Sequence, residues 1–524
     1  MKHRLSNKKQ IWMYRFENSE NIPGSPGCGK TQNNSNLVKE YINQGIDPER
    51  IACVSFTRKA ARESRERVCH DCGLEEDRLP HFQTLHSIAF REGGYKVSEV
   101  MRGEDFRKIG EAIGLSFGRD SKSLLESDFD TLGVSKGDFY MNIYHLARSK
   151  NMTWEEMFRQ AGNYNLHFSE LRRLVETYEE YKSTYNKIDF TDMIEEFIQR
   201  GNSLDVDALF VDEAQDLSTL QWQMVDILRE APDIQIFAGD DDQAIMGFQG
   251  ADVPAFLSAT QEREVLNQSY RIPNSVWHVA QSIVSRIEGR APKEWKARPE
   301  EGLVQQHQDL WDVPLEEGEW CIMARTNRIA STYADSLRDE GWVYSRNGHP
   351  SIPPKMYEGI LSWEALSKGK SLDAAELRNM YSFMTAGDGY AKGFGPRSKG
   401  LLNLDTEILI NMDFARSNLG LLYDGETRWH RSLDKISRDM QHYLLNALKR
   451  GDNVKHPRIK VSTIHSMKGG EADNILVVPD LSYAADREYQ TNPSTEHRVF
   501  YVAVTRAKKA LHLMEPSTDK YYSI

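Results

Sequence analysis

A glycine-rich segment near the N-terminus carries residue types that bind phosphate. Residues 24 to 31 read GSPGCGKT and fill every fixed position of the pattern GxxxxGK[ST]. In this pattern backbone N–H groups approach phosphate oxygens, Lys30 adds charge for the β and γ phosphates, and the Thr31 hydroxyl can bind Mg²⁺ at a helix start. A plain glycine-rich turn is the alternative. The expected phosphate loop consists of Gly24, Ser25, Pro26, Gly27, Cys28, Gly29, Lys30 and Thr31.

A parallel strand should precede this loop. Residues 18–23 are polar and include Pro23, which is unfavourable inside a central strand. We therefore expect either a very short strand or one supplied by residues 11–16.

A second acidic segment could complete a phosphate site. Residues 208–211 read ALFV and are followed by DEAQD. An apolar run that ends in acids indicates a buried parallel strand whose C-terminal end enters a site. Asp212 would then hold Mg²⁺, directly or through water, and Glu213 would orient and deprotonate an attacking water. A solvated turn is the alternative, and the complete phosphate loop disfavours it.

Length and composition indicate a large globular chain. The 524 residues correspond to roughly three to four domains of about 150 residues. No apolar run approaches the ~18 residues that cross a bilayer, and the basic N-terminus has no signal-peptide core behind it. Five scattered cysteines fit a reducing compartment, so we expect a cytoplasmic location. The net charge of −12 argues against non-specific polyanion binding but does not exclude a local basic patch.

Further motifs follow the first two in a fixed order. They are IACVSFTRKAARESRERV (51–68), FQTLHSIAFR (82–91), IDFTDMI (188–194), AGDDDQAIMGFQGAD (238–252), LNQSYR (266–271), MARTNR (323–328), STIHSMKGGEADNILVV (462–478) and VFYVAVTRAKKALHL (499–513). Together with GSPGCGKT and DEAQD, this series resembles the UvrD/Rep family of superfamily 1 DNA helicases over nearly the whole chain.

The resemblance implies a motor that uses ATP and Mg²⁺ and moves on single-stranded DNA, usually from 3′ to 5′. Such a helicase would act on single-stranded DNA and on junctions between single and double strands during replication, repair or recombination. The alternative is a translocating ATPase that remodels protein–DNA complexes, or drives a nuclease or defence assembly, without unwinding alone.

The resemblance also assigns catalytic roles. Gln243 would sense the γ-phosphate, while Arg271 and Arg506 would act as arginine fingers that neutralise charge on the γ-phosphoryl oxygens. A surface ion pair is the alternative for each arginine. The implied catalytic set is Lys30, Asp212, Glu213, Gln243, Arg271 and Arg506.

Three further residues would contact the nucleoside. Tyr270 resembles the family's adenine-stacking tyrosine, Glu471 its ribose-contacting acid and Gln10 its adenine-reading glutamine.

The predicted DNA contacts combine aromatic platforms with phosphate donors. They are Phe56, Thr57, Thr84, His86, Phe248, Thr463 and His465. His86 and His465 could instead be core histidines. A basic helix face after Phe56 would add phosphate contacts, unless it is an ordinary solvated surface. Its members are Arg58, Lys59, Arg62, Arg65 and Arg67.

One motif departs from the family pattern. Where the family reads SIYSWRG, residues 244–250 read AIMGFQG. Phe248 can replace a tryptophan as a base platform, whereas Met246 and Gln249 do not replace a tyrosine and an arginine equally well. The resemblance therefore implies a weaker or differently shared grip on DNA.

The expected architecture is α/β, with two RecA-like P-loop domains whose parallel sheets are each interrupted by a mainly helical accessory subdomain. The predicted parts are residues 1–92 with 187–272, the helical insertion 93–186, residues 273–354 with 453–524, and the reduced helical insertion 355–452.

Two short segments allow more than one interpretation. Residues 480–493 occupy the place of the family's strand-separating hairpin, where Tyr483 or Tyr489 could wedge against a base pair, but an ordinary loop is equally compatible. Cys69 and Cys72 form a CxxC with His81 nearby. Because no second pair follows at finger spacing, a surface turn is favoured over a zinc site.

Overall fold

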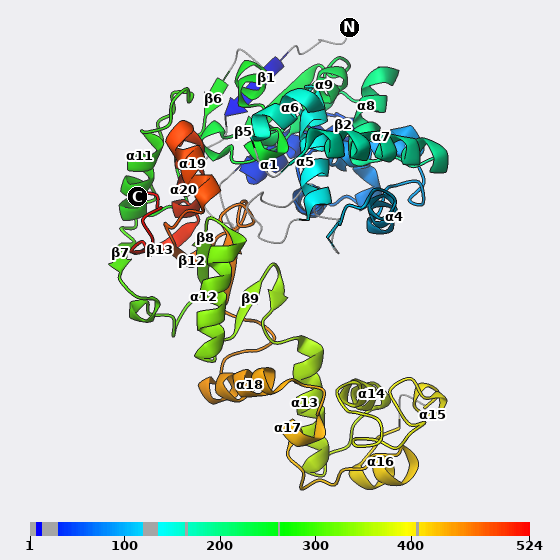
Figure 1. The fold of residues 1–524 in the computed structure, drawn as a ribbon. Helices are drawn as coiled ribbons and strands as arrows, with labels where there is room; N and C mark the ends of the chain where they lie inside the picture. The colour runs from blue at the N-terminus through cyan, green and yellow to red at the C-terminus, as the bar shows by residue number, and fades with distance from the viewer. Residues whose placement is uncertain (1–6, 13–29, 119–134, 163–165, 260–262, 405–407) are drawn as a thin grey trace. The chain divides into compact units, whose positions relative to one another are not determined.

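The computed structural model describes residues 7–12, 30–118, 135–162, 166–259, 263–404 and 408–524 (Figure 1). The chain divides into two compact units. The first unit contains residues 1–310, 325–328 and 467–524, and the second contains residues 311–324 and 329–466. Residues 273–310 and 467–524 group with the N-terminal part of the chain. The predicted domain boundaries stay predictions.

A six-stranded parallel sheet with the order β3-β2-β4-β5-β1-β6 forms the centre of the first unit. Its strands are β1 (Asn7–Trp12), β2 (Ile51–Val54), β3 (Phe82–Gln83), β4 (Ala208–Val211), β5 (Ile234–Gly239) and β6 (Arg263–Val265). Every residue of β2, β4 and β5 is buried, as expected for a parallel sheet covered on both faces. The strand before the phosphate loop begins at Asn7, earlier than the predicted range 11–16.

Alternate residues of these strands face two different apolar cores. Ala52 and Leu209 belong to one core, whereas Cys53 and Phe210 belong to the other. This two-residue alternation is the ordinary geometry of a strand. The helices associated with the sheet are α1 (Lys30–Asn43), α2 (Arg58–Cys72), α3 (Leu85–Gly93), α8 (Phe190–Arg200), α9 (Thr219–Leu228) and α10 (Val253–Ser258).

Within the described residues between α3 and α8, four helices pack around a core of their own. They are α4 (Gly103–Ile113), α5 (Lys136–Ser149), α6 (Trp154–Ala161) and α7 (Phe168–Tyr185). Tyr140, Leu171, Leu174 and Tyr178 are fully buried in this core. Their helical spacing places one apolar face of each helix inward.

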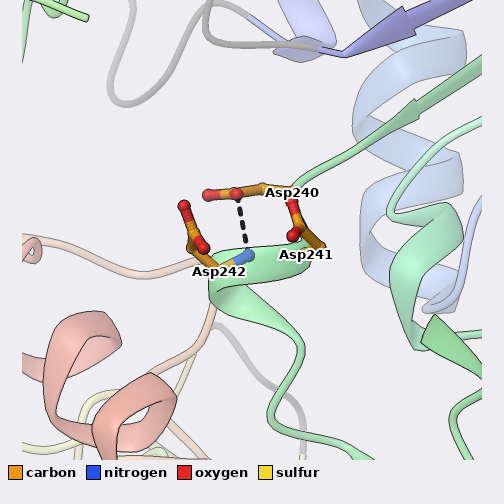
Figure 2. A group of neighbouring side chains, drawn as sticks. All are labelled: Asp240, Asp241 and Asp242. Carbon is orange, nitrogen blue, oxygen red and sulfur yellow. Dashed lines mark hydrogen bonds between the residues drawn. The ribbon is translucent and has the colours of Figure 1, made fainter. Parts of the chain in front are cut away.

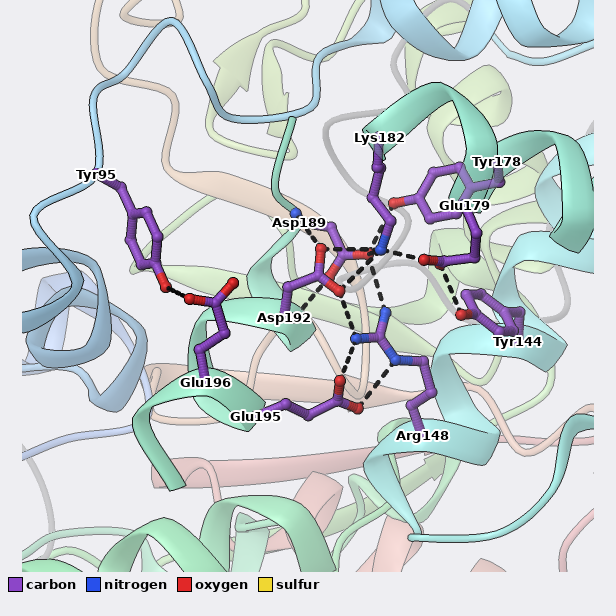
Figure 3. A network of polar contacts seen from close by, with 10 residues as sticks. All are labelled: Tyr95, Tyr144, Arg148, Tyr178, Glu179, Lys182, Asp189, Asp192, Glu195 and Glu196. Atoms are coloured by element: carbon purple, nitrogen blue, oxygen red, sulfur yellow. Dashed lines mark hydrogen bonds and ion pairs between the residues drawn. The ribbon is translucent and has the colours of Figure 1, made fainter. Parts of the chain in front are cut away.

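A buried ionic network joins these helices to α8 (Figure 3). Arg148 on α5 donates to Asp189, Asp192 and Glu195, with N–O distances between 2.6 and 3.0 Å. Lys182 on α7 donates to Asp189 at 3.0 Å and to both oxygens of Asp192 at 2.8 Å. Although burial acts in the opposite direction, Arg148, His145 and Lys182 hold the pKa of Asp189 well below its ordinary value. The network thus fixes α5 and α7 to the start of α8.

The first unit also contains a parallel group in the order β12-β13-β7. Its elements are α11 (Asn274–Val284), β7 (Leu303–His307), β12 (Ala472–Val477), α19 (Tyr483–Thr491), α20 (Pro493–Val504) and β13 (Ala507–Met514). The predicted hairpin or loop at 480–493 is wrong, because residues 483–491 form α19. Ser482 caps this helix by accepting the Ala485 N–H, and Tyr489 packs against His497 and Tyr522.

Within its described residues, the second unit contains the strands β10-β9-β11-β8, helix α12 and six later helices that pack around a separate core. The strands are β8 (Trp320–Ala324), β9 (Tyr344–Arg346), β10 (His349–Pro350) and β11 (Ile459–Thr463), and α12 spans Asn327–Asp339. The later helices are α13 (Pro354–Ser367), α14 (Ala374–Ser382), α15 (Lys399–Leu402), α16 (Met412–Asn418), α17 (Trp429–Ser432) and α18 (Arg438–Arg450). Among the described residues, no helix is long and apolar enough to cross a membrane.

Candidate nucleotide site

Two carboxylates follow strand β4 directly, as the sequence predicts. Asp212 is buried, its N–H donates to the Val54 carbonyl at 2.8 Å, and its Oδ1 accepts the Glu213 N–H at 3.0 Å. The carboxyl ends of neighbouring parallel strands meet at one edge of a sheet, which is where such folds place ligands. A buried carboxylate at this edge fits Mg²⁺, which prefers oxygen ligands.

Glu213 has an unusual backbone. Its φ of 52° lies in the left-handed region, which is unfavourable for a residue with a side chain and is concentrated at functional sites. Gln215 Nε2 donates to Glu213 Oε2 at 2.6 Å, while Gln215 Oε1 accepts the Asp240 N–H at 2.9 Å. Gln215 therefore connects the end of β4 to the end of β5.

Gly239, the last residue of β5, allows this connection. A Cβ at this position would lie 2.5 Å from Gln215 Oε1 and 2.7 Å from Phe256 Cζ. Both distances are below van der Waals contact, so a side chain at position 239 would displace Gln215.

Gln243 and Arg506 contact each other. Arg506 Nη2 donates to Gln243 Oε1 at 2.6 Å, and Arg506 Nε donates to the Val502 carbonyl at 3.0 Å. Arg506 is only 2% exposed. Gln243 Nε2 donates to Asp240 Oδ2 at 2.5 Å. Arg506 is therefore buried next to the predicted γ-phosphate sensor, and the alternative of a surface ion pair is wrong for this arginine.

Lys468 is a residue that the sequence reasoning missed. Its Nζ donates to Asp216 at 2.5 Å and to the Gln243 carbonyl at 2.7 Å. It is the first residue of the segment KGGE (468–471). The presence of a lysine in this motif was the sequence signal that could have identified it. Lys468 joins this segment to the acidic end of DEAQD and to Gln243.

Arg271 is paired with the predicted ribose-contacting acid. Its Nε and Nη2 both lie 2.9 Å from Glu471 Oε2. Arg271 is buried, so the alternative of a surface ion pair is wrong here too. The neighbouring Tyr270 ring is 47% exposed, as a stacking platform for a planar base requires.

Three consecutive aspartates follow β5, and their ligand oxygens lie within 4.8 Å of one another (Figure 2). Asp240 directly follows the strand and caps the 3₁₀ helix η5 (Asp241–Gln243), which contains Asp241 and Asp242. All three are fully buried. Such a group has the composition of a cation site, and the sequence analysis did not single it out.

A lysine ammonium supplies the cation. Lys293 Nζ donates to Asp240 at 2.8 Å and to Asp241, and it lies 2.9 Å from Asp242. Arg290 adds a bidentate pair to Asp242 at 2.6 and 2.8 Å. Although burial acts in the opposite direction, the three carboxylates raise the pKa of Lys293 above its ordinary value. The cluster of the three aspartates with Lys293 and Arg290 is therefore not a metal centre. It is called the ion cage, or the cage, below.

The predicted phosphate loop lies largely outside the described residues. Lys30 and Thr31 are the first residues of α1, and Gln10 lies on β1, but their side chains are outside the described residues. The remaining predicted loop residues outside the described ranges are Gly24, Ser25, Pro26, Gly27, Cys28 and Gly29. Their roles stay predictions.

Two predicted DNA-contacting threonines act as helix caps. Thr57 accepts the Ala60 N–H at 3.1 Å at the start of α2, and Thr84 accepts the Ser87 N–H at 3.2 Å at the start of α3. Phe56 is partly buried against the sheet core. Each side chain has a structural role, and its predicted contact with DNA stays a prediction.

The predicted histidines have different surroundings. His86 packs edge-on against Phe190, and burial together with Arg58 lowers its pKa to about 4, so its imidazole is neutral at pH 7. His465 and Thr463 belong to the second unit, where both are buried and Thr463 accepts the Ser466 N–H at 3.2 Å. Phe248 is partly exposed on the 3₁₀ helix η6 (Gly247–Gln249) in the first unit.

The predicted basic face of α2 is largely neutralised. Acidic residues of the same helix pair with Lys59 and Arg62, and Arg65 pairs with Glu76. Because exposed ion pairs of this kind contribute little energy, a polyanion could compete for the cations.

The CxxC segment is not a turn. Cys69 and Cys72 lie in the last turn of α2, and Gly73 ends the helix in the left-handed conformation. Burial raises the pKa of both thiols, which keeps them protonated at neutral pH. Metal ligation by cysteine needs the thiolate, so this environment does not favour zinc.

A parallel sheet with acids at its strand ends, and a buried arginine from a later segment beside them, is typical of the P-loop class of nucleotide-binding folds. Comparison with family models gives the family. The UvrD/REP helicase N-terminal domain matches residues 6–264, and the UvrD-like helicase C-terminal domain matches residues 370–517. The chain belongs to the UvrD/Rep-like helicase family, and the predicted α/β fold with two RecA-like domains is confirmed.

Curated relatives agree with this assignment. The ATP-dependent DNA helicase PcrA of Staphylococcus epidermidis is 22% identical over 388 residues, covering 69% of this chain and 51% of that protein. PcrA of Bacillus subtilis is 23% identical over 384 residues, covering 68% and 50%. A probable DNA helicase of Mycoplasma pneumoniae is 26% identical over 559 residues, covering 98% and 84%. The chain thus spans about half the length of the PcrA relatives that it matches.

Proposed function

We propose that this chain is an ATP-dependent motor that moves on single-stranded DNA from 3′ to 5′ and unwinds duplex DNA at junctions. The single observation that carries the proposal is the contact between Arg506 and Gln243, which places a buried guanidinium beside the predicted γ-phosphate sensor. A cytoplasmic location and a role in replication, repair or recombination are parts of the same proposal.

In the proposed reaction, acidic strand ends activate water. Asp212 and Thr31 would hold Mg²⁺, which supplies positive charge at the β and γ phosphates. Glu213 would orient the attacking water and accept its proton. Its strained backbone and its hydrogen bond to Gln215 fix the carboxylate in one position before the nucleotide arrives.

Cations opposite the strand ends would stabilise the transition state. Arg506 and Arg271 would neutralise the charge that develops on the γ-phosphoryl oxygens, with Lys30 on the phosphate-loop side. Arg506 now contacts Gln243, and Arg271 contacts Glu471. A bound triphosphate would compete for both guanidinium groups, so binding and hydrolysis would change these two contacts.

Movement on DNA would follow from the position of Phe248. Phe248 lies five positions after Gln243, on η6, which follows η5 after residues 244–246. A displacement of Gln243 by the γ-phosphate would therefore reach the predicted base platform through a few residues of backbone.

A second candidate is a translocase that does not unwind DNA alone. The observation that favours it is helix α19, which occupies the segment where the family has a strand-separating hairpin. Tyr489 is packed against Tyr522, and Tyr483 is 74% exposed on the first turn of the helix. Both tyrosines lie on a helix, so neither forms a wedge at the tip of a β-hairpin.

The test measures ATP hydrolysis with and without single-stranded DNA, followed by unwinding of 3′-tailed and 5′-tailed duplexes. The proposal expects DNA-stimulated hydrolysis, unwinding of the 3′-tailed substrate and loss of both in Lys30→Ala. Stimulated hydrolysis without unwinding of either duplex would select the translocase. Hydrolysis that ignores DNA would refute both candidates.

A further inference from the structure

Lys293 is a buried cation outside every motif that the family resemblance used. Its side chain is 1% exposed, and its ammonium group contacts all three aspartates of the cage. The residue lies between α11 and β7, 53 positions after Asp240. An isolated ammonium is costly to bury, so its position depends on these carboxylates.

Hydrogen bonds connect the cage to Gln243, the predicted γ-phosphate sensor. Lys293 Nζ binds Asp240 Oδ1 at 2.8 Å, and the other oxygen, Asp240 Oδ2, accepts a hydrogen bond from Gln243 Nε2 at 2.5 Å. The Gln243 amide therefore has a carboxylate on its nitrogen side. Arg506 donates to the oxygen side at 2.6 Å. Charged neighbours on both sides thus define which way the amide points.

The other cations of the cage do not make this connection. Arg290 binds Asp242, and Arg498 Nε donates to the Asp241 carbonyl at 2.9 Å. Among the contacts described above, the one between Lys293 and Asp240 continues to Gln243 through the second oxygen of Asp240. Arg290 binds Asp242 of the same cluster and serves as the comparison.

We propose that Lys293 is a positioning residue for nucleotide hydrolysis: it fixes Asp240, which in turn fixes the Gln243 amide between Asp240 and Arg506. The inference rests on the proposed ATPase function and adds a residue to it. Lys293 acts through Asp240 and does not touch the nucleotide. Its loss should therefore lower kcat and leave nucleotide affinity nearly unchanged.

The experiment compares Lys293→Met with Lys293→Arg and with the matched control Arg290→Met. Each full-length variant is assayed for kcat and KM with ATP and saturating single-stranded DNA, for binding of a fluorescent ADP analogue, and for its unfolding temperature. We expect Lys293→Met to lower kcat about 10- to 100-fold, the usual cost of a small misplacement at a reacting centre. The dissociation constant of the ADP analogue should change less than about twofold, because Lys293 does not reach the predicted nucleoside contacts.

The two other variants separate positioning from general stability. Lys293→Arg keeps a cation in the cage and should recover at least part of kcat. Arg290→Met removes a cation of the same cage but should leave kcat within about threefold. An equal fall in kcat for Arg290→Met and Lys293→Met would overturn the inference, as would a wild-type kcat in Lys293→Met.

A further variant covers the case in which Lys293→Met does not fold. Lys293→Met combined with Asp240→Asn removes the ammonium and one carboxylate together, so less unpaired charge is buried. This double variant should fold and still show the low kcat, because the charged acceptor for Gln243 Nε2 is gone. A normal kcat would overturn the inference. If the wild-type protein hydrolyses no ATP, the proposed function itself is refuted. If the wild-type protein is active and the double variant is equally active, only the role of Lys293 is refuted.

Discussion

Arg506 Nη2 lies 2.6 Å from Gln243 Oε1, although 263 positions separate the two residues in the chain. An N–H group of the Arg506 guanidinium and the amide oxygen of Gln243 are thus both occupied by this hydrogen bond. In the proposed reaction, an arriving γ-phosphate offers oxygens that can bind the guanidinium more strongly than an amide oxygen does. The contact is therefore well suited to report whether a triphosphate is present.

Replacing Arg506 tests this contact. We expect Arg506→Met to lower kcat by about 10³-fold or more, the lower end of the effect of an arginine finger. Arg506→Lys should recover little, because lysine lacks the planar fork. Steady-state ATPase assays measure the effect, with Arg286→Met on an exposed part of the first unit as the control. Equal rates for wild type and Arg506→Met would remove Arg506 from the site.

Phe248→Ala tests coupling to DNA. The loss of a base-stacking ring should cost about 1–3 kcal/mol of DNA affinity per base and abolish stimulation of hydrolysis by DNA. Basal hydrolysis should remain, because the proposed mechanism gives Phe248 a role in DNA binding and none in activating water. Phe158→Ala on α6 is the matched control. Undiminished stimulation would place the platform elsewhere.

Arg148→Met tests the network that fixes the accessory helices. The substitution leaves Asp189 and Asp192 without one buried cation, and breaking such pairs costs about 3–5 kcal/mol. We expect a clearly lower unfolding temperature by calorimetry. Arg172→Met, at an exposed arginine on α7 whose guanidinium lies over Phe168, should change it little. If the two variants melt alike, the network does not stabilise the fold.

The surroundings of His512 predict that the folded protein is less stable in acid. Its Nδ1 lies 2.8 Å from His307 Nε2, and burial together with His307 lowers its pKa to about 4. An unfolded histidine titrates near 6.5, so below that pH the unfolded chain binds a proton that the folded chain does not. Stability should fall by about 1–2 kcal/mol between pH 7 and pH 5 from this group.

Denaturant unfolding at the two pH values measures this loss. His512→Gln should show a smaller difference between pH 7 and pH 5 than wild type, whereas His442→Gln, at an exposed histidine of α18, should match wild type. An unchanged difference in His512→Gln would assign the acid sensitivity to other groups.

Gly239→Ala tests the close approach at the end of β5. The added methyl group would lie 2.5 Å from Gln215 Oε1 and should push this side chain away from Asp240 and Glu213. We expect a lower kcat together with a stability loss of about 1–3 kcal/mol, as for other overpacked sites. Gly247→Ala is the control, because a Cβ there meets nothing within 4 Å. Wild-type kcat in Gly239→Ala would show that Gln215 does not orient Glu213.

Much of this architecture could be predicted from local patterns. The buried strand 208–211 followed by acids is found where the sequence placed it, since apolar runs and strand-end carboxylates are signals within a few residues. Lys293 could not be predicted, because nothing near it indicates that it pairs with aspartates 53 positions earlier. The helix at 483–491 was missed because the family's hairpin was expected there, although Ser482 is a typical helix-capping residue.

The long separation between Gln243 and Arg506 also affects how the protein is made. A ribosome adds about 5–20 residues per second, so Arg506 follows Gln243 by roughly 13 to 50 s of synthesis over the 263 intervening positions. Lys293 emerges much earlier and can already neutralise the aspartates in the nascent chain. The acidic strand ends can therefore settle during translation before the guanidinium that completes them is added.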